Sequence, residues 1–268
     1  MAGLPVSLAS AARCGSIAAG KQTGDFSMSN KPTQKIQPSE AEQKKMHRFR
    51  KRTNKFRTER LAEISAGNTP AKLESGLKAI LHFVPLSAFH LVDLRDMQAV
   101  GNCYSGGTPI YGSTIIQPDP HFNFDGVAYC DVVDPHNPKS VSRCYIQFFR
   151  NGAIEVVVSF PALNGTKSLP NAAFVGAMQK SLGLCLNLSK QLGVNPPAFA
   201  CLTLTEVKGW AIWTKTGGPF TQEIKRDILP VPEKMIESNT ASASDILKPV
   251  FDIVWQAGRT PGMPDRAK

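Results

Sequence analysis

The sequence has no apolar segment that approaches the roughly 18 residues needed for a membrane-spanning helix, so we expect no contact with a membrane. It also lacks any C-x-x-C pair, and we expect no zinc site built on cysteine. Several of its cysteines fall in segments that look like strands or helices, where a reduced thiol behaves as a small apolar side chain. We therefore expect a cytoplasmic protein whose cysteines are free. Its six cysteines are Cys14, Cys103, Cys130, Cys144, Cys185 and Cys201.

Motifs of the common enzyme classes are missing as well. There is no H-E-x-x-H, no G-x-S-x-G and no complete phosphate loop. The histidines follow no metal-ligand spacing, and the aspartates at 93, 96, 125 and 131 fit turn and capping roles better than acid–base catalysis. The sequence therefore predicts a non-enzymatic protein with no cofactor and no metal. The histidines are His47, His82, His90, His121 and His136.

The composition predicts a folded, basic protein. The chain has 268 residues, 42% of them hydrophobic, which is enough for a substantial core. Its formal net charge is +10 and its isoelectric point lies near 9.4. An excess of positive charge favours anionic partners such as nucleic acid, although many soluble proteins are basic without a specific partner.

The segment from Cys144 to Phe160, CYIQFFRNGAIEVVVSF, predicts a central β-hairpin. Asn151-Gly152 matches the two positive-φ residues of a two-residue type I′ turn, between runs of β-branched and aromatic residues. Both faces of this hairpin are largely apolar, so we expect it to be covered on both sides. The pairs expected across it are Phe149 with Ile154, Gln147 with Val156, Tyr145 with Val158, Phe148 with Glu155 and Ile146 with Val157.

The order of the remaining segments predicts an α+β fold with an antiparallel sheet of about six strands around the hairpin, packed by two or three helices. Residues 1–38 predict a disordered tail, 39–66 a basic amphipathic helix, 67–258 the α+β domain and 259–268 a C-terminal tail. Gly67 and Gly193 are expected to end the helices that precede them. Expected helices span 39–66, 87–98, 171–192 and 244–257, and expected strands span 75–86, 122–133, 198–207 and 210–215, with a loop over 101–121.

The basic stretch from Lys44 to Arg60 is the sharpest feature for function. It holds nine Lys or Arg residues against one acidic residue, Glu59. A helix with this charge density can follow a nucleic-acid backbone, where each phosphate contact releases counterions. The alternative is a solvated helix face that has no binding role and whose charge opposes aggregation. The residues predicted to contact nucleic acid are Lys44, Arg48, Arg50, Lys51, Arg52, Lys55 and Arg57.

A second hypothesis is a ligand-sensing or protein-interaction module in which the basic helix has no role in binding. Under this hypothesis an apolar pocket is lined by Tyr129, Trp210 and Trp213. The two hypotheses make different structural predictions. Clustered, exposed Lys and Arg side chains favour nucleic acid, whereas a concave aromatic pocket favours a small ligand.

Several segments occur in an order that resembles a known family. The segments are FRTERLAEISAGNTP at 56–70, LHFVPLSAF at 81–89, NFDG at 123–126, YIQFFRNGAIE at 145–155, LGVNPP at 192–197 and DILPVPE at 227–233. Together they resemble the C-terminal region of bacterial proteins with a Schlafen/AlbA-type DNA-binding domain, often labelled ATP-binding or helix-turn-helix proteins. The resemblance covers about residues 49–258.

The resemblance implies kinship more than activity, because the shared segments look structural. In that family the AlbA-type domain precedes this region and carries the nucleic-acid or nucleotide function, and here a polar lead-in and the basic helix take its place. The ATP-binding label therefore transfers to no residue of this chain. The resemblance implies a non-enzymatic accessory or regulatory domain of DNA-binding proteins.

Overall fold

The computed structural model describes residues 39–90, 96–103, 120–132, 140–213, 221–238 and 240–264, and the described residues from Glu40 onward belong to one compact unit. The expected N-terminal tail lies outside these residues. Within them the fold is α+β, as the sequence predicts. The helices are α1 (Glu40–Ser65), the 3-10 helix η1 (Leu86–Phe89), α2 (Met97–Cys103), α3 (Asn171–Gln191) and α4 (Ala243–Ala257).

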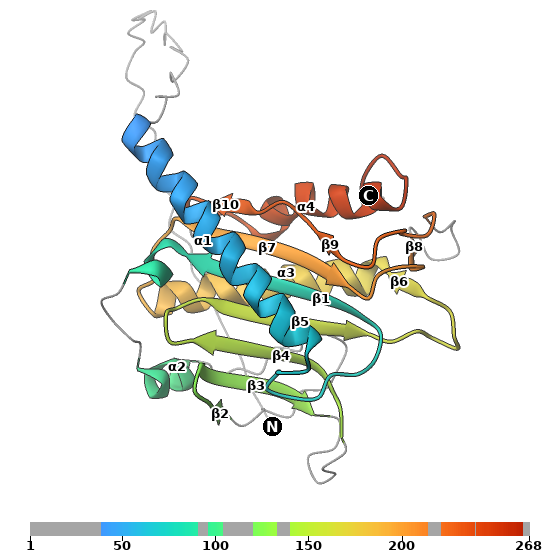
Figure 1. Ribbon diagram of the computed structural model, residues 1–268, viewed down its shortest axis with the longest axis horizontal. Coiled ribbons are helices and arrows are strands. Elements are labelled where there is room, and N and C mark those ends of the chain that lie inside the picture. Colours follow the sequence, from blue (N-terminus) through green and yellow to red (C-terminus); the bar gives the residue numbers. More distant parts are fainter. Residues whose placement is uncertain are drawn as a thin grey trace, which may run out of the picture. The chain divides into compact units, whose positions relative to one another are not determined.

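The main sheet has eight strands and every pairing in it is antiparallel. Its order is β10-β7-β1-β5-β4-β3-β2, and β9 also pairs with β7. Helix α1 crosses one face of this sheet, while α3 and α4 cover the other (Figure 1). The strands are β1 (Leu77–Pro85), β2 (His121–Phe122), β3 (Gly126–Val132), β4 (Ser142–Phe149), β5 (Ile154–Phe160), β7 (Ala198–Thr205), β9 (Leu229–Pro230) and β10 (Lys234–Ile236).

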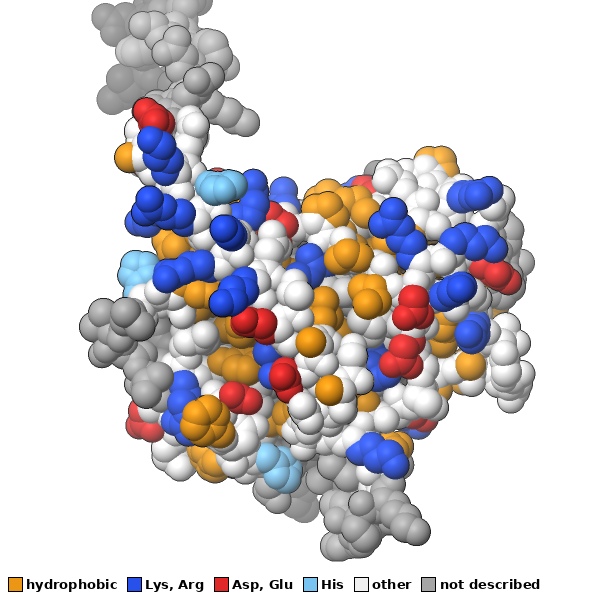
Figure 2. Space-filling view, in the orientation of Figure 1, with side chains coloured by type: hydrophobic (Ala, Val, Ile, Leu, Met, Phe, Trp, Pro, Cys, Tyr) orange, Lys and Arg blue, Asp and Glu red, His pale blue; other side chains and the backbone are white. Residues whose placement is uncertain are grey.

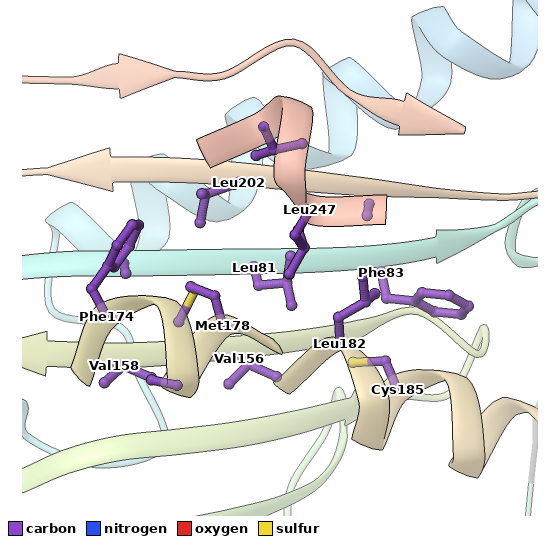
Figure 3. Close-up of a cluster of buried hydrophobic side chains, with 14 of the residues drawn as sticks. Leu81, Phe83, Val156, Val158, Phe174, Met178, Leu182, Cys185, Leu202 and Leu247 are labelled. Atoms are coloured by element: carbon purple, nitrogen blue, oxygen red, sulfur yellow. The ribbon is translucent and has the colours of Figure 1, made fainter. Parts of the chain in front are cut away.

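The largest core cluster lies between the sheet and the pair α3 and α4. Alternate residues of each strand, such as Leu81 and Phe83 on β1, point to this side because the side-chain period of a strand is two. Figure 3 shows them meeting Phe174, Met178 and other side chains of α3. This layer is almost entirely apolar, and its burial is the main source of stability.

The opposite face of the sheet, under α1, mixes apolar and charged residues. Ile80 and Val84 on β1 are buried here, but His82 between them is also buried, and Glu155 on β5 lies next to it. Helix α1 buries Phe49, Thr53, Arg57 and Ile64 against this face. The layer beneath α1 therefore contains buried polar and charged side chains as well as apolar ones.

The hairpin is present, but its register differs from the expected one by one residue. Phe148 pairs with Ile154, and Gln147 pairs with Glu155. The reason is the turn. Gly152 has a φ of +88° and Asn151 does not have a positive φ, so the loop is a three-residue turn that ends in a left-handed glycine. Gly152 N–H donates to the carbonyl of Phe149 over 2.8 Å. The expected type I′ turn is wrong, because only one residue adopts the left-handed conformation.

Other elements differ from the sequence prediction in their extent. The expected helix over 87–98 is replaced within the described residues by η1 and by α2, which begins only at Met97 and enters the expected loop. The expected strand 122–133 is divided into β2 and β3 by a turn in which Asn123 Oδ1 accepts a hydrogen bond from Gly126 N–H over 2.8 Å. Two short strands that the sequence did not predict, β9 and β10, pair with β7. Strand β8 (Ala211–Trp213) leaves the main sheet and pairs in parallel with β6 (Ser168–Pro170).

The helix ends follow the glycines in the sequence. Gly67 and Gly193 have φ values of +83° and +65°, which are left-handed conformations that suit glycine after a helix. Asn68 N–H then donates to the carbonyl of Glu63, and Val194 N–H donates to that of Ser189. Both predicted ends are confirmed. No helix in the described part of the chain is long and apolar enough to span a bilayer.

Candidate phosphate-binding groove

Helix α1 is held on the sheet by one row of side chains. Phe49 stacks on Phe199 of β7 with ring centroids 4.6 Å apart, and meets the edge of Phe89 at 5.8 Å. Thr53 and Arg57 follow at steps of four residues, which keeps them on the same side of the helix. Most of the Lys and Arg side chains beside this row remain in solvent, and these carry most of the positive charge of α1.

The structure removes Arg57 from the predicted nucleic-acid contacts. Its side chain is buried, and its guanidinium donates to Thr203 Oγ1 at 2.8 Å, to the carbonyl of Val231 at 2.9 Å and to that of Leu202 at 2.6 Å. Burial lowers the pKa of this guanidinium, with Cys201 and Glu233 acting in the opposite direction. Arg57 therefore joins α1 to the sheet edge, and its burial keeps its guanidinium from a phosphate in solvent.

A groove of about 380 Å³ runs between the N-terminal half of α1 and η1. Among the described residues that line it, the Lys and Arg side chains have no carboxylate beside them in the lining, and His90 also lines it. Figure 2 shows blue Lys and Arg side chains gathered along α1. Apolar atoms of Phe49, Leu86 and Phe89 complete the walls. The cations lining the groove are Lys44, Lys45, Arg48 and Arg52.

A second, smaller cleft of about 310 Å³ adjoins this groove and shares Arg52, Phe89 and His90 with it. It adds Lys55 and one carboxylate, Glu59, which pairs with Lys55 at 3.7 Å. The cations of the two hollows recur at steps of four, four and three residues, from Lys44 through Arg48 and Arg52 to Lys55. This spacing places them along one side of the helix over about 16 Å.

Three of these cations, Lys44, Arg52 and Lys55, contact other residues of the protein. Lys44 pairs with Glu40 at 2.5 Å, but both side chains are exposed, so that pair contributes little free energy. Arg52 donates one hydrogen bond to the carbonyl of Phe89 over 3.1 Å and lies over its ring. These contacts orient Arg52 and leave further N–H groups of its guanidinium free.

The other two predicted cations point elsewhere. Arg50 lies over the ring of Phe199 and pairs with Glu233 at 2.5 Å, on the side of α1 away from the groove. Lys51 is exposed and lines neither hollow. The structure thus brings together Lys44, Arg48, Arg52 and Lys55 of the predicted set.

Sequence reasoning missed three contributors to the groove. Lys45 belongs to the basic stretch but was not among the predicted contacts. Phe89 and His90 lie on η1 and just after it, about forty residues along the chain, and no local pattern links them to α1. Tertiary contacts of Phe89 with Phe49 and Arg52 bring them to the helix.

Beneath α1 lies a buried polar cluster centred on Glu155, which is 0% exposed. Arg60 of α1 donates to both carboxylate oxygens over 3.0 Å, Tyr145 O–H donates over 2.8 Å, and His82 Nε2 lies 2.9 Å away. Burial alone would raise the pKa of Glu155, but His82 and Arg60 more than offset it and lower that pKa to about 2. Burial and then Glu155 raise the pKa of Tyr145.

This cluster contains residue types that are common in catalytic sites, but its side chains are not accessible to solvent. Phe56 packs edge-on against His82 with centroids 5.7 Å apart, and Arg60 lies over the ring of Phe149 at 5.1 Å. Glu155, His82 and Tyr145 are all 0% exposed. A substrate cannot reach them, so the cluster can orient α1 but cannot act on a ligand.

The aromatic pocket of the second hypothesis is not assembled by the described residues. Tyr129 on β3 is 4% exposed and donates its hydroxyl to the carbonyl of Gly101 over 3.0 Å, and burial raises its pKa. Trp210 is 2% exposed in the core beyond the end of β7. Because β3 and β7 are four strand spacings apart in the sheet, they are separated by roughly 19 Å. Trp213 on β8 is only partly buried but shares no described cleft with the other two.

The described residues contain no group of three or more His, Cys, Asp or Glu side chains arranged to hold a metal ion. Comparison with protein-family models, with curated proteins and with solved structures finds no match to this chain.

Proposed function

We propose that the chain is a non-enzymatic accessory or regulatory protein that contacts nucleic-acid phosphates through the groove between α1 and η1. The observation that carries this proposal is the lining of that groove, where the described residues include four Lys or Arg side chains and no carboxylate. Cations held on one side of a helix attract a polyanion and gain free energy by releasing its counterions. No element of the groove is shaped to read bases, so the proposed binding is independent of sequence.

The formal charge of +10 supports the same proposal, because it raises the rate at which a polyanion reaches the molecule. Kinship with the C-terminal region of Schlafen/AlbA-type proteins belongs to the proposal and rests on the segments quoted above. A cytoplasmic location also belongs to it. The free, buried thiols of Cys130, Cys144, Cys185 and Cys201 are compatible with a reducing compartment.

The test is binding of a fluorescent 20-base-pair duplex of random sequence at 50 and 200 mM salt, followed by anisotropy. If four cations contact phosphates, log Kd changes with log salt with a slope near 3.6, and affinity falls roughly 150-fold between the two salt concentrations. Replacing Lys44, Lys45, Arg48 and Arg52 with Ala together should remove most of that slope.

A matched control removes as much charge from other surfaces. Lys180, Lys190, Lys208 and Arg226 are exposed and lie outside α1, and changing them to Ala should leave the slope within about one unit of wild type. Equal losses in the two variants would mean that net charge, and not the groove, drives binding. Absence of binding by wild type at 50 mM salt would refute the proposal.

A further inference from the structure

A separate cleft of about 530 Å³ lies at the C-terminal end of α1. It is lined by Ile64, Leu73 and Thr205 and by the turn at Gly67 that ends the helix. Ile228, which is 45% exposed, also lines it. This volume lies in the range of small-ligand sites. The cleft is about ten or more residues along α1 from the phosphate-binding groove, so the two sites are distinct.

The charges of this cleft are balanced, unlike those of the groove. Lys78 and Glu206 line it and form an ion pair with each other. Lys72 and Asp227 also line it, and neither has an ion-pair or hydrogen-bond partner for its side chain within the described part of the chain. One ammonium group and one carboxylate group are therefore available to a ligand.

Two features of the backbone support a ligand site here. Glu206 has a φ of +56°, and such left-handed conformations in residues other than glycine concentrate where a ligand is held. Helix α1 ends at the cleft, and its last turn has no basic residue to balance the negative end of the helix dipole. A ligand cation would find both that helix end and Asp227.

We infer that this cleft binds a small zwitterion, a free amino acid or a dipeptide with an aliphatic side chain. The ligand's ammonium group would lie near Asp227 and the C-terminal end of α1, and its carboxylate near Lys72. Its side chain would contact Ile64, Leu73 and Ile228. A phosphate-bearing ligand fits less well, because the carboxylates of Asp227 and Glu206 line the same cleft and only one ammonium group is unpaired.

The test is isothermal titration calorimetry of the full chain with L-leucine and L-leucyl-L-leucine. N-acetyl-L-leucine, which lacks the cation, and L-leucinamide, which lacks the anion, are the charge controls. We expect at least one zwitterion to bind and the analogues of L-leucine to bind about tenfold more weakly than L-leucine. No binding of either zwitterion up to about 10 mM would overturn the inference.

Two variants test the assignment of each charge. Lys72→Met should weaken L-leucine binding about tenfold and leave L-leucinamide binding unchanged. Asp227→Asn should weaken L-leucine binding about tenfold and leave N-acetyl-L-leucine binding unchanged. Lys72 and Asp227 are exposed, so neither variant should disturb folding. Binding that both variants retain would overturn the site.

Exposed charges outside the cleft provide the controls. Lys208→Met and Glu223→Gln should leave the affinity for L-leucine unchanged. Asp227→Asn should also leave the salt slope for duplex binding unchanged, because Asp227 is remote from the groove. Loss of zwitterion binding and loss of phosphate binding can therefore be told apart.

Discussion

Glu155 is the residue whose environment matters most for the placement of α1. It is a buried carboxylate that receives hydrogen bonds from Arg60 on both oxygens and from Tyr145 on one. Burying such a charge is unfavourable unless its partners satisfy it, and a buried pair loses much more when one partner is removed than it gains when formed. The cluster therefore specifies where α1 sits more than it adds net stability.

Glu155→Gln should reduce the free energy of unfolding by about 3 kcal/mol, because the guanidinium of Arg60 loses its counter-charge in a largely buried position. Urea unfolding followed by circular dichroism measures this change. Glu59→Gln is the matched control, since Glu59 is exposed and pairs only with Lys55, and it should change stability by less than about 0.5 kcal/mol. Equal effects of the two changes would contradict the assigned role of Glu155.

The same carboxylate predicts a dependence of stability on pH. Because the pKa of Glu155 is lowered to about 2 in the folded state, its contribution is fully present above its unfolded pKa near 4.5. That contribution should disappear as pH falls from about 5 to about 2. Arg60, His82 and Tyr145 are the charged or titratable groups that face Glu155.

The measurement is the difference in unfolding free energy between wild type and Glu155→Gln at pH 6, 4 and 3. The difference should shrink at the two lower values, since protonation makes the wild-type carboxyl resemble the amide. A difference that stays constant from pH 6 to pH 3 would show that Glu155 is not held ionised by its partners.

At the scale of elements, α1 combines two roles in one helix. Its C-terminal half is fastened to the sheet by Arg57 and Arg60, which donate hydrogen bonds to acceptors on the sheet strands and on Val231. Its N-terminal half contacts the protein through Phe49 and presents its cations to solvent and to the groove. Basic residues of one stretch therefore serve opposite purposes, according to which side of the helix they occupy.

The hairpin turn gives a prediction that separates its two possible geometries. In the observed turn only Gly152 has a positive φ, so Gly152→Ala should cost about 1 kcal/mol or more. Asn151→Ala loses only the hydrogen bond from Ala153 N–H to Asn151 Oδ1 and should cost less. Thermal unfolding of both variants shows which of them loses more stability. A larger loss for Asn151→Ala would favour a type I′ turn.

For the molecule as a whole, the state of the thiols can be tested. Burial raises the pKa of Cys130, Cys144, Cys185 and Cys201 to about 12. At pH 8 these four residues should resist iodoacetamide in the native protein and react fully in 6 M guanidinium chloride, because the thiolate is the reactive form. Peptide mapping by mass spectrometry gives the extent at each site. Rapid native labelling of any of the four would contradict its burial.

Much of the architecture was predictable from local patterns. Helix α3, helix α4 and the central hairpin follow from apolar periodicity, and the ends at Gly67 and Gly193 follow from the conformational freedom of glycine. The short strands β9 and β10 were not predictable, because they form only by pairing with the edge of β7.

The candidate site was predictable only in part. The basic stretch identified α1 as the charged element, and its helical period placed Lys44, Arg48, Lys51 and Lys55 on one side. Of these four, Lys51 lines neither hollow. Sequence could not show that Arg57 is buried while Arg52 is exposed, because that depends on which side of α1 meets the sheet.

The sequence by itself determined the α+β class, the positions of the long helices and the excess of positive charge, because these depend on residues close together in the chain. Tertiary structure decided the register of the hairpin, the burial of Glu155 beside His82, and the groove that joins α1 to η1. Each of these depends on contacts between distant segments. Their free energy comes from burying surfaces against each other, which no local pattern records.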